Sequence, residues 1–142
     1  MNRWLLVRSD GRVLALPAGS VEELVEIASP LPAPGVLPAV RGVAPYRGRL
    51  VPLVHVMAAI GDVTPPPEVG TTAVAVLVDG RRMLLEVDEA DAIVTAPETS
   101  LPPGWGGQWA AGAVRQPEGL VPVLNLEWLV DRLMRTAASR SV

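Results

Sequence analysis

The sequence predicts an all-β fold made of two small closed β-barrels packed together, with short helices and a C-terminal helix. Three observations lead to this prediction. Short apolar runs alternate with turn sequences such as Asp-Gly, as in chains of short strands. Part of the pattern recurs in the second half of the chain, which indicates a duplicated unit. Hydrophobic residues make up 49% of the 142 residues and charged residues 19%, so the chain can bury a core.

The N-terminal part is expected to begin with a hairpin. Runs 3–8 and 12–16 flank Asp10-Gly11, a pair that favours a two-residue turn. Ser20-Val21-Glu22-Glu23 has the form of a capping box and predicts a short helix over 21–27. The apolar residues of this segment recur at helical spacing, which supports the same prediction.

A second hairpin is expected after a connector. Prolines spread over 30–38 predict an extended segment with no helix. Runs 42–45 and 49–54 then read as strands joined through Tyr46-Arg47-Gly48, and 56–60 as a helical turn that ends at Gly61.

The C-terminal half repeats this plan. Runs 72–78 and 81–87 flank Asp79-Gly80, a strand follows over 92–95, and 97–108 is a long loop. A last hairpin joins 109–114 to 119–124, and Asn125 is expected to cap a helix that runs to about residue 137. The apolar side of this helix comprises Leu126, Leu129, Val130, Leu133 and Met134.

The internal repeat is the most informative pattern. Leu50-Val51-Pro52 recurs in the second half of the chain as Leu120-Val121-Pro122, and Asp10-Gly11-Arg12 recurs at nearly the same spacing as Asp79-Gly80-Arg81. We therefore predict a single domain over 1–142 with two barrel halves and a boundary within about 61–71. An arrangement in which the chain ends complete each other's barrel is also considered. The predicted core comprises Val51, Leu53, Val76, Leu85, Val121, Val123 and Leu126.

The composition excludes several classes of function. The chain has no cysteine and a single histidine, which argues against a metal site, a disulfide or a thiolate nucleophile. A net charge of −3 argues against a nucleic-acid partner. No run approaches the roughly 20 apolar residues that span a bilayer, so we expect a cytoplasmic protein without direct membrane insertion. We expect no cofactor and no catalytic residue.

Three features of the sequence are candidates for a catalytic or ligand-binding site. His55 is a candidate general base, but its apolar neighbours favour a packed or hydrogen-bonded histidine. Trp105 and Trp109, in or beside a glycine-rich loop, could stack on a ligand, although packing over a barrel mouth is the more ordinary interpretation. The acidic residues between Glu86 and Asp91 lack calcium-loop spacing and favour a solvated turn.

The second hairpin resembles a known signature. The run from Gly42-Val43 through Arg47-Gly48 to the apolar strand 50–56 resembles that of CheW-like coupling domains. The segment Leu24-Val25-Glu26-Ile27 is similar to the family's apolar-Glu-Ile motif. The stretches 85–93 and 120–126 resemble its later motifs, so the likeness covers nearly the whole chain in order.

This resemblance implies two five-stranded SH3-like barrels and a non-enzymatic adaptor. Such proteins link the cytoplasmic tip of a methyl-accepting chemoreceptor to the regulatory domain of a CheA-type histidine kinase, and they are recruited to membrane receptor arrays. The receptor tip is expected in the groove between the barrels and the kinase domain on the side of one barrel. The residues that the resemblance and the sequence pattern assign to partner binding are Arg47, Gly48, Leu24, Glu26, Ile27 and Val43.

Two departures from the family pattern bear on the pathway. His55 stands where the family usually has aspartate, and Ala44-Pro45-Tyr46 replaces the segment that usually contains asparagine. Flagellar chemotaxis and a twitching-motility type of pathway therefore both remain open. The sequence leaves two alternative functions: a small-ligand-binding barrel with Trp105 and Trp109 over a cavity, and a hydrolase that uses His55.

Overall fold

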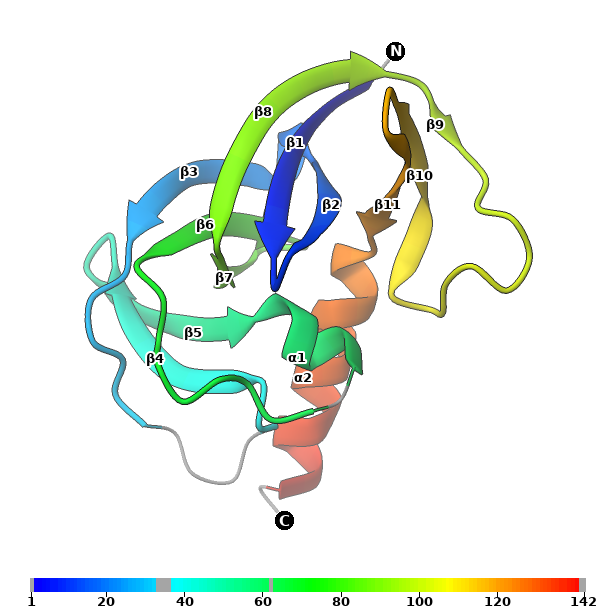
Figure 1. Ribbon diagram of the computed structural model, residues 1–142. Coiled ribbons are helices and arrows are strands. Elements are labelled where there is room, and N and C mark those ends of the chain that lie inside the picture. The colour runs from blue at the N-terminus through cyan, green and yellow to red at the C-terminus, as the bar shows by residue number, and fades with distance from the viewer. Residues whose placement is uncertain (1, 33–36, 62, 141–142) are drawn as a thin grey trace.

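The computed structural model describes residues 2–32, 37–61 and 63–140, with side chains described as far as Met134. The described residues form two sheets, each of which curls into a barrel (Figure 1). Barrel A contains β1 (Asn2–Ser9), β2 (Arg12–Pro17), β8 (Glu89–Ala96), β9 (Glu98–Thr99), β10 (Ala110–Gln116) and β11 (Gly119–Leu124). Barrel B contains β3 (Val21–Glu26), β4 (Val40–Tyr46), β5 (Arg49–His55), β6 (Thr72–Val78) and β7 (Arg81–Val87). The expectation of an all-β, two-barrel fold is confirmed.

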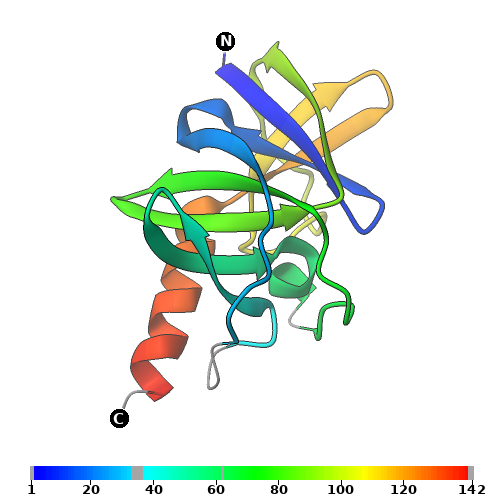
Figure 2. The ribbon, with the colours of Figure 1, turned by 90° about the vertical axis from the view of Figure 1, so that its left-hand side faces the viewer.

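The two barrels do not divide the chain at the expected boundary. Barrel A has the strand order β8-β1-β2-β11-β10-β9 and so joins strands from the beginning and the end of the chain. Barrel B has the order β3-β6-β7-β5-β4 and uses the middle. The expected boundary, 61–71, falls between β5 and β6 along the chain, and both of these strands belong to barrel B. The sheets instead divide at a short 3₁₀ turn, Ala18–Ser20, and after Val87. Figure 2 shows the two barrels stacked one above the other.

Each barrel is closed where the chain beyond one edge strand of the sheet, β8 or β3, continues to the opposite edge. In barrel A, β8 leads into β9, which pairs with β10 at Ala113 and Val114. In barrel B, the chain beyond β3 returns to β4, where Leu31 and Val43 exchange two backbone hydrogen bonds of 2.8 and 2.9 Å. Gly42 is required there, because a Cβ atom at this position would collide with the Leu31 carbonyl oxygen.

The expected hairpins are present, and their turns repeat. Asp10 and Gly11 have φ values of 49° and 80°, and Asp79 and Gly80 have 50° and 77°. Positive φ at both central residues is the two-residue turn whose twist matches the flanking strands. The repeat extends to pairing: β4–β5 and β10–β11 share a bulge at equivalent positions, and β5 and β11 each add a parallel neighbour.

The helix predicted over 21–27 is wrong, because these residues form β3. The strand pairs with the edge of β6, from Val21 opposite Val76 to Glu26 opposite Thr72. A bulge at Glu22 shifts the side-chain alternation, so that Val25 and Ile27 pack against the interior of barrel B. A strand partner and a core outweigh a capping box in a segment this short.

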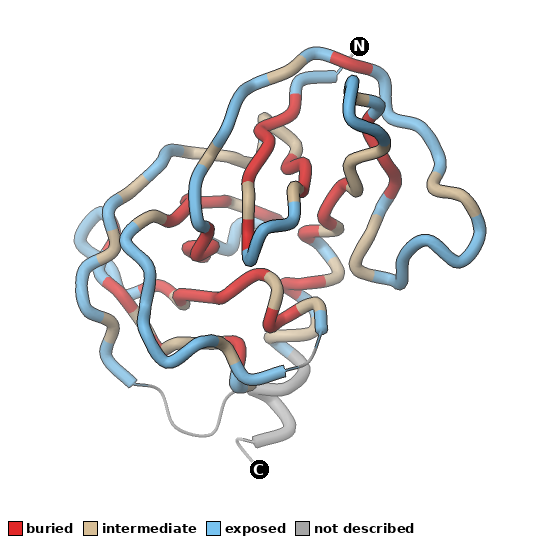
Figure 3. The backbone as a smooth tube through the Cα atoms, viewed as in Figure 1, coloured by how far each residue is buried: buried red, intermediate tan, exposed pale blue. Residues whose placement is uncertain are grey.

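The core has three parts. One lies inside each barrel, and the third lies between them and includes residues of β1, β2, β6, β7 and both helices. Figure 3 shows the buried segments concentrated in the strands that face one another. The predicted core residues are buried except Val121, which is half-buried because barrel A is open beside it.

Two helices continue from equivalent strands. α1 (Val56–Gly61) follows β5, and α2 (Leu126–Arg140) follows β11 and extends past the predicted end near residue 137. Leu126, Leu129 and Val130 bury the first turns of α2, whereas Met134 is exposed. No helix in the described part of the chain is long and apolar enough to cross a membrane. Residues 33–36 of the proline-rich connector lie outside the described residues.

Candidate functional site

The tip of the β4–β5 hairpin presents Arg47. Tyr46 pairs with Arg49, so that Arg47 and Gly48 form the turn with φ values of 50° and 76°. Gly48 adopts this left-handed conformation without steric cost, and the turn places Arg47 at the outer end of the barrel. The Arg47 side chain is 55% exposed, which leaves it accessible to a partner.

A network of charged side chains holds this tip against the start of β3. The Arg47 guanidinium donates to Glu23 Oε1 at 3.2 Å and to Glu22 Oε2 at 3.3 Å. The Tyr46 hydroxyl donates to Glu23 Oε1 at 2.9 Å. Arg82 on β7 donates to both oxygens of Glu22, at 2.8 and 3.2 Å. We call Glu22, Glu23, Tyr46 and Arg47 the seal of barrel B, because they close the seam between β3, at one edge of its sheet, and the β4–β5 hairpin at the other edge.

The electrostatics of the seal follow from these contacts. The hydrogen bond from Arg82, together with the charges of Arg82 and Arg47, lowers the pKa of Glu22 below its ordinary value of 4.5. Burial, followed by the hydrogen bond to Glu23, raises the pKa of Tyr46 above 10.0. Glu22 is therefore ionised and the Tyr46 phenol neutral near pH 7.

The remaining predicted partner residues do not gather around Arg47. Leu24 is 52% exposed and Glu26 is exposed, whereas Ile27 is half-buried and packs against the interior of barrel B. Val43 is half-buried and bonded to Leu31 through its backbone. Sequence reasoning missed Glu22 and Glu23, the residues that bond Arg47, because it placed them on a helix.

His55 is buried and acts as a helix cap. Its Nδ1 accepts a hydrogen bond of 3.1 Å from the backbone N–H of Ala58 in α1, so the proton of the neutral ring resides on Nε2. Nε2 lies 3.4 Å from Asp10 Oδ1, at the β1–β2 turn of barrel A. Asn125, at the equivalent point of the repeat, caps α2 in the same way by accepting from Trp128 N–H at 3.0 Å. His55 thus occupies a capping position and contacts the other barrel.

These contacts disfavour the hydrolase interpretation of His55. The hydroxyl of Ser9, the residue before Asp10, is buried and makes no hydrogen bond within the described residues, so His55 does not activate it. The cap occupies Nδ1. Among the described residues, no group of three or more histidine, aspartate or glutamate side chains is arranged to hold a metal ion.

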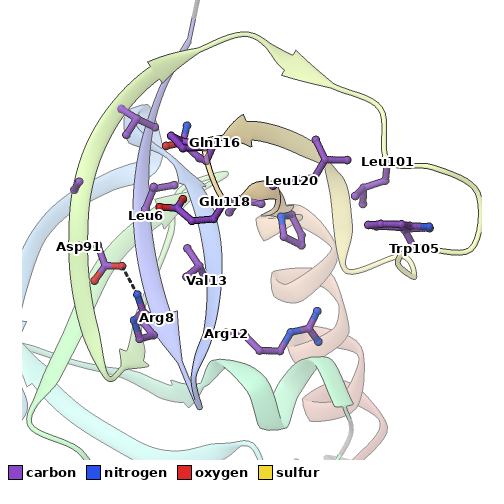
Figure 4. Close-up of a pocket in the computed structure, with 16 residues that line it drawn as sticks. Leu6, Arg8, Arg12, Val13, Asp91, Leu101, Trp105, Gln116, Glu118 and Leu120 are labelled. Atoms are coloured by element: carbon purple, nitrogen blue, oxygen red, sulfur yellow. Dashed lines mark hydrogen bonds and ion pairs between the residues drawn. The ribbon is translucent and has the colours of Figure 1, made fainter.

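A groove opens on barrel A (Figure 4). It has a volume of about 770 Å³ and is bounded by β8, the β10–β11 turn and the 97–108 loop. Trp105 lines it and is 64% exposed, whereas Trp109 is half-buried against the core between the barrels. Of the two tryptophans that the sequence singled out, only Trp105 faces this groove.

A buried ion pair was missed by sequence reasoning. Arg41 Nε donates to Glu86 Oε1 at 2.7 Å, and both side chains are 7% exposed. Arg41 also donates to the carbonyl oxygens of Pro66 and Glu68, and Glu86 accepts from Gly70 N–H at 2.9 Å. The pair fastens the segment between α1 and β6 to barrel B. The solvated turn expected for the acidic cluster is therefore wrong for Glu86.

Three comparisons place the chain among known proteins. Residues 3–134 match the family described as the CheW-like domain. The fold is similar to the crystal structure of the scaffolding protein TtCheW from Thermoanaerobacter tengcongensis, with a TM-score of 0.79 and 16% identity. That alignment covers 90% of this chain and 86% of the other. Comparison with curated proteins gives no significant match. Since the family match covers most of the sequence and the two-barrel fold agrees with it, this chain belongs to the CheW-like domain family.

Proposed function

We propose that the protein is a non-enzymatic adaptor that couples a chemoreceptor to a CheA-type histidine kinase in a bacterial chemosensory pathway. Family membership over residues 3–134 is the observation that carries this proposal. The similarity to a structure titled as a scaffolding protein agrees with it. The cytoplasmic tip of a methyl-accepting receptor and the regulatory domain of the kinase are the proposed partners.

The tip of barrel B is the proposed contact for the kinase domain. A docking surface needs accessible apolar area and a directional charge at its edge. Arg47 supplies the charge, the exposed Leu50 lies on the same hairpin, and the exposed Leu24 lies on β3, the strand to which Arg47 is bonded. Glu22 and Glu23 fix the orientation of the guanidinium, so little side-chain entropy is lost when a partner binds. The groove between the barrels remains the proposed site for the receptor tip.

Arg47 also has a structural role to be separated from binding. Its bonds to Glu22 and Glu23 tie the hairpin to β3, so its removal weakens the seal as well as any contact. Arg82 shares Glu22 but lies outside the predicted contact residues. Arg82→Ala is therefore the matched control for loss of the network alone.

The test measures thermal stability and binding for Arg47→Ala and Arg82→Ala. We expect Arg47→Ala to weaken binding of the kinase regulatory domain by about 1–3 kcal/mol, while Arg82→Ala lowers stability to a similar degree and leaves binding nearly unchanged. Equal effects of the two variants on binding would show that Arg47 acts only through the network. If neither the regulatory domain nor a receptor-tip peptide binds the wild-type protein at about millimolar concentration, the adaptor proposal is wrong.

A further inference from the structure

The seams of the two barrels are equivalent in backbone and different in side chains. In barrel B, Val21 pairs with Val76 and Glu23 with Ala75, with Glu22 in the bulge between them. In barrel A, Ala90 pairs with Val7 and Ala92 with Leu6, with Asp91 in the bulge. The two bulges align β3 with β8 position by position. The hairpins at the opposite edge of each sheet, β4–β5 and β10–β11, correspond in the same way, because each has a bulge at the same position.

This correspondence shows that barrel A retains only one acidic residue of the seal, Asp91 at the position of Glu22. Ala92 stands at the position of Glu23, Gln116 at that of Tyr46 and Pro117 at that of Arg47. Tyr46 is 6% exposed and fills the mouth of barrel B, whereas Gln116 is half-buried at the rim of the groove. The barrel A seam therefore lacks the phenol ring, its carboxylate partner and the arginine.

The groove exposes residues that would otherwise form a closed interior. Val13, Val94 and Val121 pack against the interior cluster of barrel A, yet all three are half-buried and line the groove. Val51, the equivalent of Val121, is 6% exposed in barrel B. Figure 4 shows Leu6 and Val13 between Asp91 on one side and Leu101 and Trp105 on the other. The walls are mostly strands, and an aromatic side chain stands at the rim.

The polar side chains that line the groove are a minority: Arg8, Arg12, Asp91, Gln116 and Glu118. Asp91 is bonded to Arg8 at 3.1 Å, and Glu118 is exposed on the β10–β11 turn. In barrel B the Tyr46 hydroxyl donates to Glu23, whose place Ala92 takes in barrel A, whereas Asp91 stands at the place of Glu22. A groove of about 770 Å³ with mostly apolar walls and a minority of polar groups has the form of a small-molecule site.

We propose that the open seam of barrel A binds a small molecule with a single aromatic ring and a hydroxyl or similar hydrogen-bond donor. The ring occupies the place that Tyr46 fills in barrel B, against Leu6, Val121 and Trp105. The donor faces the carboxylates of Asp91 and Glu118. This binding function does not depend on the adaptor role, which is assigned to barrel B and to the groove between the barrels.

The test uses p-cresol, which is the isolated side chain of tyrosine, and the full-length protein. Methyl resonances of Leu6, Val13 and Val121 and the indole resonance of Trp105 report on the groove. We expect saturable shifts with p-cresol and none with 4-methylcyclohexanol, which has similar size but no aromatic ring. The double variant Ala92→Glu/Gln116→Tyr transplants part of the seal and should weaken p-cresol binding at least about tenfold.

Two further variants keep the test decisive. Trp105→Ala, in an exposed loop, should fold and weaken binding even if the double variant does not fold. Ile93→Ala alters an exposed side chain next to Ala92 that does not line the groove, and it should leave binding unchanged.

Several results would overturn the proposal. These are absence of saturable shifts up to about 10 mM, equal binding of 4-methylcyclohexanol, or unchanged binding by both the double variant and Trp105→Ala. The kinase regulatory domain forms a separate arm. If the double variant blocks that domain while p-cresol fails to bind, a partner side chain occupies the groove and the small-molecule proposal is wrong.

Discussion

Barrel A and barrel B share a strand order, a bulge in each outer pairing and a capped helix after the equivalent strand. They differ in how the interior is completed. Barrel B closes its mouth with Tyr46 and the charged seal, and it holds its linker with the buried Arg41–Glu86 pair. Barrel A has neither feature at the equivalent positions and retains a groove. Two barrels with the same strand order can therefore end in different surfaces: barrel B in a closed, charged tip and barrel A in an open groove.

The deepest equivalent core positions should be equally intolerant of charge. Leu53 is fully buried in barrel B and Val123 is 2% exposed in barrel A. Leu53→Asp and Val123→Asp should each abolish cooperative unfolding, because an unpaired carboxylate in an apolar core costs several kcal/mol. Circular dichroism during thermal melting measures this. A normal transition in either variant would show that the two positions are not equivalent.

The stability of the protein should depend strongly on Arg41 of barrel B. It should depend little on Arg115, the arginine of β10 in barrel A. Arg41→Ala leaves the Glu86 carboxylate buried without its cation and should lower the free energy of unfolding by about 3–5 kcal/mol. Arg115→Ala, at an exposed position of β10, is the control and should change it by less than about 0.5 kcal/mol.

A double variant sharpens this prediction. Arg41→Met/Glu86→Leu removes both charges and should recover most of the stability lost in Arg41→Ala, because no unpaired ion remains. Urea denaturation gives the three values. A loss below about 1 kcal/mol in Arg41→Ala would mean that water reaches Glu86.

The two helix caps should contribute by the same mechanism. Asn125→Ala removes the acceptor for Trp128 N–H and should cost about 0.5–2 kcal/mol. His55→Ala should cost more, because it also removes a buried ring. Asp10→Asn retains a residue that tolerates positive φ and reports on the contact between the barrels alone. If His55→Ala costs less than Asn125→Ala, the capping role of His55 is wrong.

The seal should make barrel B sensitive to acid. Since the pKa of Glu22 is lowered below 4.5 by Arg82 and Arg47, its contribution to stability is fully present above pH 4.5. Below that value the unfolded chain takes up the proton first, and the contribution is lost as the pH falls through the lower folded value. Urea midpoints measured from neutral pH downward should fall less steeply for Glu22→Gln than for the wild type. Parallel curves would contradict this.

Local chemistry accounts for most of what could be predicted. The Asp10-Gly11 and Asp79-Gly80 turns adopt positive φ at both residues, which short-range sterics already favour. Asn125 caps α2 as expected, and the Arg47-Gly48 turn lies where its glycine indicates. The family resemblance is confirmed by the match over residues 3–134.

The candidate sites were less accessible to prediction. The similarity of Glu22-Glu23-Leu24-Val25 to Asp91-Ala92-Ile93-Val94, at the same spacing as the two Asp-Gly-Arg turns, was a usable signal that both segments are strands. Without it, the partners of Arg47 were assigned to a helix. The groove of barrel A depends on what is missing at Ala92 and Gln116, and it becomes visible only when the two seams are compared.

The sequence by itself determined the hairpins, the repeat and the family, because turns and apolar spacing act over a few residues. Tertiary pairing with β6 made 21–26 a strand against its local helical pattern, and tertiary structure alone decided that barrel A unites both ends of the chain and that Arg41 reaches Glu86. These outcomes depend on pairing between segments distant in the chain. A strand edge, a bulge and a buried charge become favourable only once the other barrel residues are in place.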